Sequence, residues 1–381
     1  MTSPSDTLSQ GLGRLLPTYA RAELTIVRGE GARVWDTDGR EYLDLGAGIG
    51  VVALGHRHPA PLAAALAQLE QLWHASNLYR TEPAERLAAR LSERFGGAQA
   101  FFCNSGTEAV EAALKYARKA TGKPGVVALE GGFHGRTLGA LSATGQPAKR
   151  EPFEPLVPGV RFVPPNDHEA LREAVDDDVG LILLETILGE GGVLPLEAEF
   201  VMAAKELPPF LCLDEVQTGI GRTGSFFAFE GLAVRPDLVT LAKGLANGLP
   251  IGALLVADDV AGAFAAGDHG STFGGNPVAC AAAGAVVDAI DEELLESVRV
   301  QGSRLASGLA SLRAVADVRG RGLLLGFVVD RPASEVVSAC REQGVLVLTA
   351  GDDVVRLSPP LTIGAEEVEE ALGAIAAALE A

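Results

Sequence analysis

Phe210-Leu211-Cys212-Leu213-Asp214-Glu215-Val216 is an apolar run that ends in two carboxylates. Because its apolar residues are consecutive rather than alternating, the run is typical of a β-strand that is covered on both faces of a sheet. Six further β-rich runs are separated by helical or loop segments: Ala98–Asn104, Gly125–Leu129, Val160–Val163, Val179–Glu185, Leu238–Ala242 and Gly252–Ala257. Seven strands with intervening helices predict an α/β fold with a mostly parallel seven-stranded sheet. In such sheets the ligand lies beyond the carboxyl ends of the strands.

The C-terminal part of the chain predicts a smaller α+β domain. Its expected elements are a long Ala-rich helix at about Pro277–Leu312, a β-rich run at Val318–Val329, a helix near Ala333–Gln343, strands at Val345–Leu348 and Val354–Ser358, and a final helix at Ala365–Leu379. Near the N-terminus, Ala32–Asp36 and Glu41–Asp44 flank the turn Asp38-Gly39 and predict a hairpin that packs on this domain. We therefore expect a large domain of residues 45–288 and a small domain formed by residues 1–44 and 289–381.

Composition restricts the possible partners. The chain has 381 residues, 48% hydrophobic and 21% charged, which indicates a soluble globular protein long enough for two domains. Its formal net charge of −19 disfavours nucleic acid and anionic membranes as partners. No apolar run reaches the roughly 18 residues of a membrane helix, and no apolar core of a secretion signal precedes the first strand. The four cysteines form no CxxC pair, so we expect buried free thiols and a cytoplasmic protein.

Lys243 is one of only six lysines, and it alone lies in apolar surroundings, in Leu238-Val239-Thr240-Leu241-Ala242-Lys243-Gly244. An ammonium among apolar groups loses hydration, so its pKa falls and the free amine becomes available as a nucleophile. That is the chemistry of a lysine that forms Schiff bases. Taken alone, the segment favours a lysine that extends its charge from a strand end into solvent.

Two glycine-rich segments carry candidate binding residues. Ser105 and Glu108 have capping-box spacing, so a helix should begin there, and its free N–H groups would suit a phosphate or only an ordinary cap. Phe133 is preceded by Gly131-Gly132, which leaves room for a flat ring to stack on it. Arg136 offers a fork for a carboxylate, and a plain surface arginine is the alternative. We assign no catalytic role to His134.

Burial of the Asp214 and Glu215 carboxylates at the end of an apolar strand would cost free energy unless a cationic partner is close to them. No histidine or octahedral oxygen shell accompanies them, so we expect no metal site. A protonated ring nitrogen of a ligand would satisfy the same need. Asp214 precedes Lys243 by one crossover, so both can reach one ligand.

Together these segments resemble the ordered signatures of class III aminotransferases, which are pyridoxal-phosphate (PLP) enzymes of fold type I. The matching segments are Asn104-Ser105-Gly106-Thr107-Glu108, Phe133-His134-Gly135-Arg136-Thr137, Asp214-Glu215-Val216-Gln217-Thr218-Gly219, Ala242-Lys243-Gly244 and Ser271-Thr272-Phe273-Gly274-Gly275-Asn276-Pro277. The resemblance runs from about Tyr19 to the final helix, which is nearly the whole chain.

The resemblance implies a role for each matching residue. Lys243 would bind PLP as a Schiff base and later move a proton, while Asp214 would keep the pyridine nitrogen protonated. The remaining cofactor-binding residues would be Ser105, Gly106 and Thr107 at the phosphate, Phe133 on the ring and Gln217 at the ring hydroxyl. Thr272 would reach the phosphate of the other subunit, so the resemblance implies a homodimer with shared active sites.

The resemblance also bears on the substrates, an amino donor and 2-oxoglutarate. Arg356 would bind the α-carboxylate of 2-oxoglutarate or glutamate, and Glu190 would pair with Arg356 while an ω-amine is bound. Arg136 would bind the other carboxylate, and Tyr19 would line the pocket. Ile49 takes the place of a tyrosine that holds the free α-amino group in ornithine aminotransferases. This replacement favours an acylated donor, N2-acetylornithine, whose transamination gives N-acetylglutamate 5-semialdehyde in arginine biosynthesis.

Other functions stay open at the level of sequence. Thr186 and Leu188 replace the proline and glutamine that are common in the family before Glu190, which leaves the pocket detail open. One alternative is an aminotransferase of lysine biosynthesis that acts on an ω-semialdehyde carried by an acidic carrier protein. A 4-aminobutyrate or ornithine aminotransferase is another. A PLP-fold protein without catalysis belongs to a different class, and intact Lys243 and Asp214 argue against it.

Overall fold

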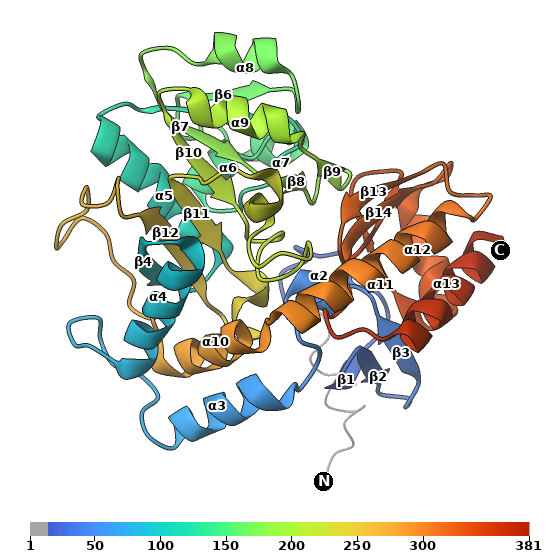
Figure 1. The fold of residues 1–381 in the computed structure, drawn as a ribbon. Coiled ribbons are helices and arrows are strands. Elements are labelled where there is room, and N and C mark those ends of the chain that lie inside the picture. The colour runs from blue at the N-terminus through green and yellow to red at the C-terminus, as the bar shows by residue number, and fades with distance from the viewer. Residues whose placement is uncertain (1–13, 381) are drawn as a thin grey trace.

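The computed structural model describes residues 14–380, which form a large sheet with helices on both faces and a smaller α+β part beside it (Figure 1). The large sheet has seven strands in the order β4-β12-β11-β10-β7-β5-β6. Its strands are β4 (Ala98–Cys103), β5 (Gly125–Leu129), β6 (Val160–Val163), β7 (Val179–Leu184), β10 (Phe210–Asp214), β11 (Leu238–Leu241) and β12 (Gly252–Ala257). Only β12 runs antiparallel to its neighbours. The predicted seven-stranded, mostly parallel sheet is therefore confirmed.

Both faces of this sheet are covered because alternate residues of each strand enter different hydrophobic clusters. In β5, Val127 and Leu129 belong to one cluster, whereas Val126 and Ala128 belong to the other. Successive side chains of a strand point to opposite faces, so a strand buried on both sides must be apolar throughout. This is the physical origin of the unbroken apolar runs.

The helices that cover the sheet come from the connections between strands. Helix α5 (Gly106–Thr121) packs on one face and supplies buried residues to the smaller cluster, while α4 (Glu82–Phe95) packs against β4 on the other face. The other helices of this part are α2 (Ala47–Gly50), α3 (Pro59–Leu69), α6 (Leu138–Ser142), α7 (Pro147–Arg150), α8 (His168–Ala174), α9 (Ala198–Glu206) and α10 (Pro277–Ala289), with 3-10 turns η1 (Glu151–Phe153), η2 (Ala228–Leu232) and η3 (Lys243–Ala246).

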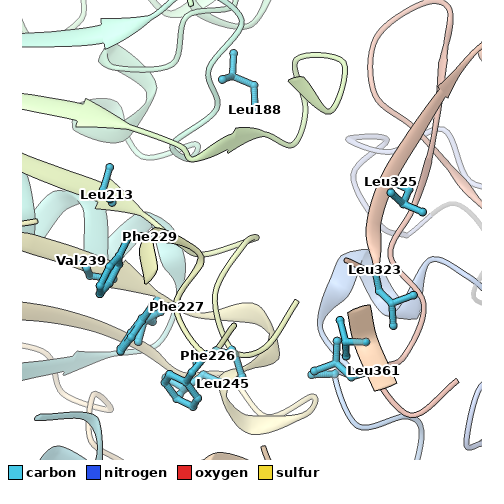
Figure 2. Close-up of a cluster of buried hydrophobic side chains, with 14 of the residues drawn as sticks. Leu188, Leu213, Phe226, Phe227, Phe229, Val239, Leu245, Leu323, Leu325 and Leu361 are labelled. Carbon is cyan, nitrogen blue, oxygen red and sulfur yellow. The ribbon is translucent and has the colours of Figure 1, made fainter. Parts of the chain in front are cut away.

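The larger hydrophobic cluster extends from the seven-stranded sheet into the C-terminal part of the chain (Figure 2). At the sheet, Phe227 stacks on Phe229 with ring centroids 5.0 Å apart and meets Phe226 edge-on. The same cluster includes Leu323 and Leu361, which follow in the C-terminal part. Because this core is continuous, the two parts of the molecule share buried apolar surface.

The smaller part combines both ends of the chain. Its two sheets have the strand orders β1-β2-β3-β15 and β13-β14-β17-β16. The strands are β1 (Ile26–Glu30), β2 (Arg33–Asp36), β3 (Glu41–Asp44), β13 (Asp317–Arg321), β14 (Leu324–Val328), β15 (Val345–Leu346), β16 (Leu348–Thr349) and β17 (Val354–Leu357), with helices α11 (Glu292–Ala310), α12 (Ala333–Glu342) and α13 (Ala365–Glu380). The predicted hairpin is present as β2 and β3, and β3 pairs with β15. A two-stranded ribbon, β8 (Ile187–Leu188) with β9 (Leu194–Pro195), completes the strands of residues 14–380.

Two expected elements differ from the structure. The single helix expected at about Pro277–Leu312 is two helices, because Asp291 lies between them in an extended conformation and its side chain accepts a hydrogen bond of 2.9 Å from the N–H of Leu294. That bond caps the N-terminus of α11 and so separates α11 from α10. The strand expected at Val345–Leu348 is divided between β15 and β16, which belong to different sheets.

All four cysteines are buried and unpaired with one another. Within residues 14–380, no helix is long and apolar enough to cross a bilayer.

Candidate active site

A cavity of about 380 Å³ opens beyond the carboxyl ends of β10 and β11. Its lining residues all come from the large part: Val51; Asn104, Ser105, Gly106 and Thr107; Phe133, His134, Gly135 and Arg136; Glu185; Asp214, Val216 and Gln217; Ala242 and Lys243; Gly248, Leu249, Pro250 and Ile251. This is where a doubly wound sheet places its ligand, and the volume suits a small cofactor.

Lys243 lies directly beyond β11 and lines the cavity. Its backbone φ is +38°, a left-handed conformation that costs a non-glycine residue free energy and is typical of functional positions. Burial lowers the pKa of its amine to about 8, and the nearby charge of Arg356 contributes in the same direction. A substantial fraction of the amine is therefore neutral and nucleophilic near physiological pH.

Asp214 ends β10 with a buried carboxylate whose two oxygens both have partners. Oδ1 accepts hydrogen bonds from the hydroxyl of Thr240 (2.9 Å) and the N–H of Val216 (3.1 Å), and Oδ2 lies 2.7 Å from Nδ1 of His134. Burial alone would lower the pKa of His134, but the hydrogen bond and the charge of Asp214 outweigh burial and raise it. His134, to which sequence analysis gave no catalytic role, is thus the partner that holds Asp214.

The N-terminus of α5 forms another wall of the cavity. Ser105 caps the helix as predicted, since its hydroxyl donates to Glu108 Oε2 (2.7 Å) and accepts from the N–H of Glu108. Gly106 is required here, because a Cβ at this position would lie 2.8 Å from the methyl carbons of Val216. The hydroxyl of Thr107 is 2.8 Å from that of Thr137. Free N–H groups of a 16-residue helix therefore face the cavity, which is an arrangement that binds phosphate.

Phe133 and Arg136 come from the loop after β5. The N–H of Phe133 donates to Glu185 Oε1 over 2.8 Å, which fixes the backbone beside the ring. Arg136 is exposed at the cavity, and its guanidinium carbon lies 5.6 Å from the centre of the Phe133 ring. An aromatic face and a free guanidinium are therefore presented side by side.

Arg356 and Glu190 form an ion pair next to the cavity. Arg356 lies on β17 and is 3% exposed, and its Nη1 is 2.8 Å from Glu190 Oε1, 2.6 Å from the carbonyl of Gly189 and 3.2 Å from Gln217 Oε1. Burial would raise the pKa of Glu190, but the charge and hydrogen bond of Arg356 lower it. Arg356 comes from the small part and Glu190 from the loop between β8 and β9, and Arg356 reaches the cavity through Gln217, which lines it.

Two residues of the site were missed by sequence analysis. Glu185 is buried at the carboxyl end of β7, where burial raises its pKa to about 7. It accepts hydrogen bonds from the N–H groups of Phe133 and Gly189, and its position after an apolar strand, like that of Asp214, is a signal that could have found it. Lys149 on α7 lies 3.8 Å from Glu190 and 4.8 Å from the centre of the Phe133 ring. No pattern in its segment marks it.

Five predicted site residues lie outside the set that lines the cavity, and three of them, Tyr19, Ile49 and Thr272, are exposed. Tyr19 is 72% exposed and contacts Arg21, whose guanidinium carbon lies 5.6 Å from its ring centre. Ile49 is 45% exposed with a φ of +69°, in a turn of α2 where Gly48 is also left-handed. Thr272 is exposed in the loop before α10. Of the other predicted residues, Arg356 contacts the lining residue Gln217 and Glu190 pairs with Arg356, and the rest line the cavity.

The donor set fits a phosphorylated aromatic aldehyde. A phosphate can be bound by the N-terminus of α5, an aromatic ring can stack on Phe133, a ring N–H can donate to the buried carboxylate of Asp214, and the amine of Lys243 can bind an aldehyde carbon. In contrast, residues 14–380 contain no group of three or more His, Cys, Asp or Glu side chains arranged to hold a metal ion.

Comparison with known families agrees with this geometry. The profile of the aminotransferase class-III family matches residues 17–379. The chain belongs to the class III aminotransferases. A curated relative named acetylornithine aminotransferase, from Methanopyrus kandleri, is 50% identical over 96% of each chain.

Solved structures of class III aminotransferases have the same fold. The ornithine aminotransferase of Toxoplasma gondii superimposes with a TM-score of 0.94 at 32% identity, over 100% of this chain and 96% of that one. The N-acetylornithine aminotransferase of Stenotrophomonas maltophilia gives a TM-score of 0.83 at 38% identity, over 95% and 97% of the two chains. The predicted α/β architecture of fold type I is therefore confirmed.

Proposed function

We propose that this chain is a PLP-dependent aminotransferase that transfers the δ-amino group of N2-acetylornithine to 2-oxoglutarate. The products are N-acetylglutamate 5-semialdehyde and glutamate, as required in arginine biosynthesis. The observation that carries the proposal is the ion pair of Arg356 and Glu190 (2.8 Å) beside Lys243, because it can present or withhold a carboxylate-binding cation. Curated relatives at 49–50% identity that are named acetylornithine aminotransferases support the choice of donor.

Different residues of the cavity would bind different parts of the cofactor. Ser105, Gly106 and Thr107 would hold the phosphate, Phe133 would stack on the ring and Gln217 would contact the ring hydroxyl. When bound, PLP supplies an electron sink for the substrate carbon that bears the amino group. Asp214, held by His134 and Thr240, would keep a proton on the ring nitrogen because a buried carboxylate favours a cationic neighbour.

Lys243 would act twice in this scheme. Its neutral amine would hold the cofactor, and during turnover the same amine would take the proton from the substrate carbon that bears the amino group and deliver it to the cofactor carbon. A pKa of about 8 suits both roles, since a general base works best when its pKa is near the working pH.

The two substrates differ in the carboxylates that they bring to the cavity. N2-acetylornithine has one, which would bind to Arg136, so Arg356 is left without a substrate carboxylate and is neutralised by Glu190. The second substrate, 2-oxoglutarate, has two carboxylates and would use Arg136 and Arg356. Ile49, in place of a residue that could hold a free α-amino group, favours the acylated donor over ornithine. Tyr19 would line the substrate tail.

A homodimer with shared active sites is part of the proposal. Large apolar side chains are exposed together on α3, on the segment after it and beside Thr272: Leu62 (41%), Leu66 (54%), Leu72 (42%), Trp73 (70%), Leu78 (87%), Tyr79 (74%) and Phe273 (62%). Such a concentration of exposed apolar side chains is typical of an interface. Thr272 would then reach the phosphate bound by the partner subunit.

The remaining assignments are a domain division and a location. We propose a large domain of residues 45–288, a small domain of residues 1–44 and 289–381, and a cytoplasmic enzyme. The charge of −19 supports small molecules as partners, without nucleic acid or membrane, and weakens docking to an acidic carrier protein.

The donor assignment is tested by single-turnover half-reactions of the PLP-loaded enzyme with N2-acetylornithine, ornithine and 4-aminobutyrate. We expect N2-acetylornithine to react fastest. Equal rates, or a faster reaction with ornithine, would refute the assignment, and no reaction with any donor would support the non-catalytic alternative.

A further inference from the structure

The carboxylate of Glu190 lies between two cations that come from different parts of the molecule. Its Oε1 is 2.8 Å from Arg356 Nη1 on β17, and its Oε2 is 3.8 Å from Lys149 Nζ on α7. The side chains of Glu190 and Lys149 are 26% and 25% exposed, so neither charge is fully hydrated. The proposed function uses the first contact and gives no role to the second.

The proposed reaction requires Glu190 to release Arg356 whenever 2-oxoglutarate binds. A carboxylate that is freed in a partly buried place, without a new partner, loses interaction energy that hydration only partly restores. Binding of 2-oxoglutarate would then be weakened by the cost of displacing Glu190. A second cation within reach would remove most of that cost.

The backbone around Glu190 is packed too closely to move far. The N–H of Gly189 donates to Glu185 Oε2 (3.2 Å), and its carbonyl accepts from Arg356 (2.6 Å). A Cβ at Gly191 would lie 2.6 Å from the carbonyl oxygen of Gly131, so the loop lies directly against its neighbour. The carboxylate of Glu190 must therefore move by rotation of its own side chain, which restricts it to cations that are already close.

Lys149 is the second cation close to Glu190, and contacts of its own segment hold it there. Gln146, just before α7, donates from Nε2 to the carbonyl of Gly131 over 3.1 Å, and the Lys149 ammonium lies over the ring of Phe133. Burial lowers the pKa of Lys149, while the charge of Glu190 is the largest influence that raises it. The ammonium thus depends on Glu190 for its stability.

We propose that Lys149 is a positioning residue that receives the Glu190 carboxylate while the α-carboxylate of 2-oxoglutarate occupies Arg356. No covalent bond changes, because Glu190 exchanges one ion pair for another. This inference rests on the proposed function, since it assumes that one substrate binds to Arg356 and the other does not.

The test compares the two half-reactions in a Lys149→Met variant, which keeps an unbranched stem beside Phe133 but loses the charge. We expect kcat/KM for 2-oxoglutarate to fall about tenfold and that for the amino donor to change less than about twofold, as for loss of one member of a partly buried charge pair. Lys149→Arg should restore most of the lost rate. Lys119→Met removes the surface ion pair that Lys119, on α5, makes with Asp268, and serves as the matched control, for which we expect unchanged half-reactions.

A double-mutant cycle separates this role from a structural one. In a Glu190→Gln background no charge has to be re-paired, so Lys149→Met should have no further effect on the 2-oxoglutarate half-reaction. Equal slowing of both half-reactions, or an undiminished effect in that background, would overturn the proposal. If the wild type fails with N2-acetylornithine, the donor assignment fails instead, and the Lys149 proposal is still tested with enzyme aminated by any donor.

Discussion

Nδ1 of His134 lies 2.7 Å from Oδ2 of Asp214, and both side chains are buried at the base of the cavity. The charge of one residue therefore determines the protonation of the other: the carboxylate raises the pKa of the imidazole despite burial. The pair joins the loop after β5 to the end of β10, so the part of the cavity that would hold a ring nitrogen is fixed from two sides.

Replacing His134 should weaken this arrangement in two measurable ways. In His134→Ala, Asp214 loses its buried hydrogen-bond partner, so we expect the free energy of unfolding to fall by about 2 kcal/mol and turnover to fall with it. His134→Asn, whose amide can donate from nearly the same place, should recover part of both losses. Chemical denaturation and steady-state kinetics provide the measurements, and equal behaviour of the two variants would contradict the role of the hydrogen bond.

Uptake of PLP should depend on pH through Lys243. Only the neutral amine can attack an aldehyde, and burial sets its pKa to about 8. The rate of uptake by the cofactor-free enzyme should therefore rise about tenfold per pH unit below that value and level off above it. Stopped-flow absorbance of the lysine-bound cofactor gives this profile. Lys243→Ala should show no such absorbance at any pH, and a flat profile for the wild type would be evidence against a titrating lysine.

Glu190→Ala should change the preference between substrates. Without Glu190, Arg356 is an unpaired buried cation whenever N2-acetylornithine is bound, so we expect that half-reaction to slow by about tenfold or more. Binding of 2-oxoglutarate no longer has to displace a carboxylate and should be equal or tighter. The ratio of the two kcat/KM values measures the effect, and parallel changes in both would argue against selective pairing.

The large sheet could be predicted because burial on both faces requires mostly apolar strands, and most of its strands are apolar runs; the edge strands β4 and β6 carry Gln99 and Arg161. The break before α11 could not, since a single aspartate inside a helical pattern is as often a surface residue as a cap. Division of Val345–Leu348 between two sheets arises because β15 pairs with β3, which is distant in the chain, whereas β16 pairs with the next strand, β17; local propensity does not specify the distant partner.

The same distinction applies to the site. Asp214 and Lys243 stand out because charge follows an apolar strand, and the capping box of Ser105 is a local pattern. Lys149 lies in a one-turn helix, and only the folded chain brings it to within 3.8 Å of Glu190. The contact between those two residues was therefore beyond any local reading of the sequence.

The role proposed for Thr272 can be tested apart from dimer formation. Thr272→Val removes a hydroxyl from an exposed position, so the dimer should persist while the Kd for PLP rises about tenfold through loss of a hydrogen bond to phosphate. In contrast, Trp73→Glu places a charge in the exposed apolar surface and should dissociate the dimer. Analytical ultracentrifugation and PLP titration separate the two effects. Unchanged PLP affinity in Thr272→Val would remove that residue from the shared site.

Ile49 offers a test of strain at the edge of the site. Its φ of +69° is unfavourable for a β-branched residue, whereas asparagine adopts this conformation more readily. Because the side chain is 45% exposed, little packing is lost in Ile49→Asn, so we expect the free energy of unfolding to rise by about 1 kcal/mol. If Ile49 also excludes donors with a free α-amino group, the same variant should react faster with ornithine relative to N2-acetylornithine. A more stable enzyme with unchanged donor preference would show that Ile49 is strained for reasons other than substrate choice.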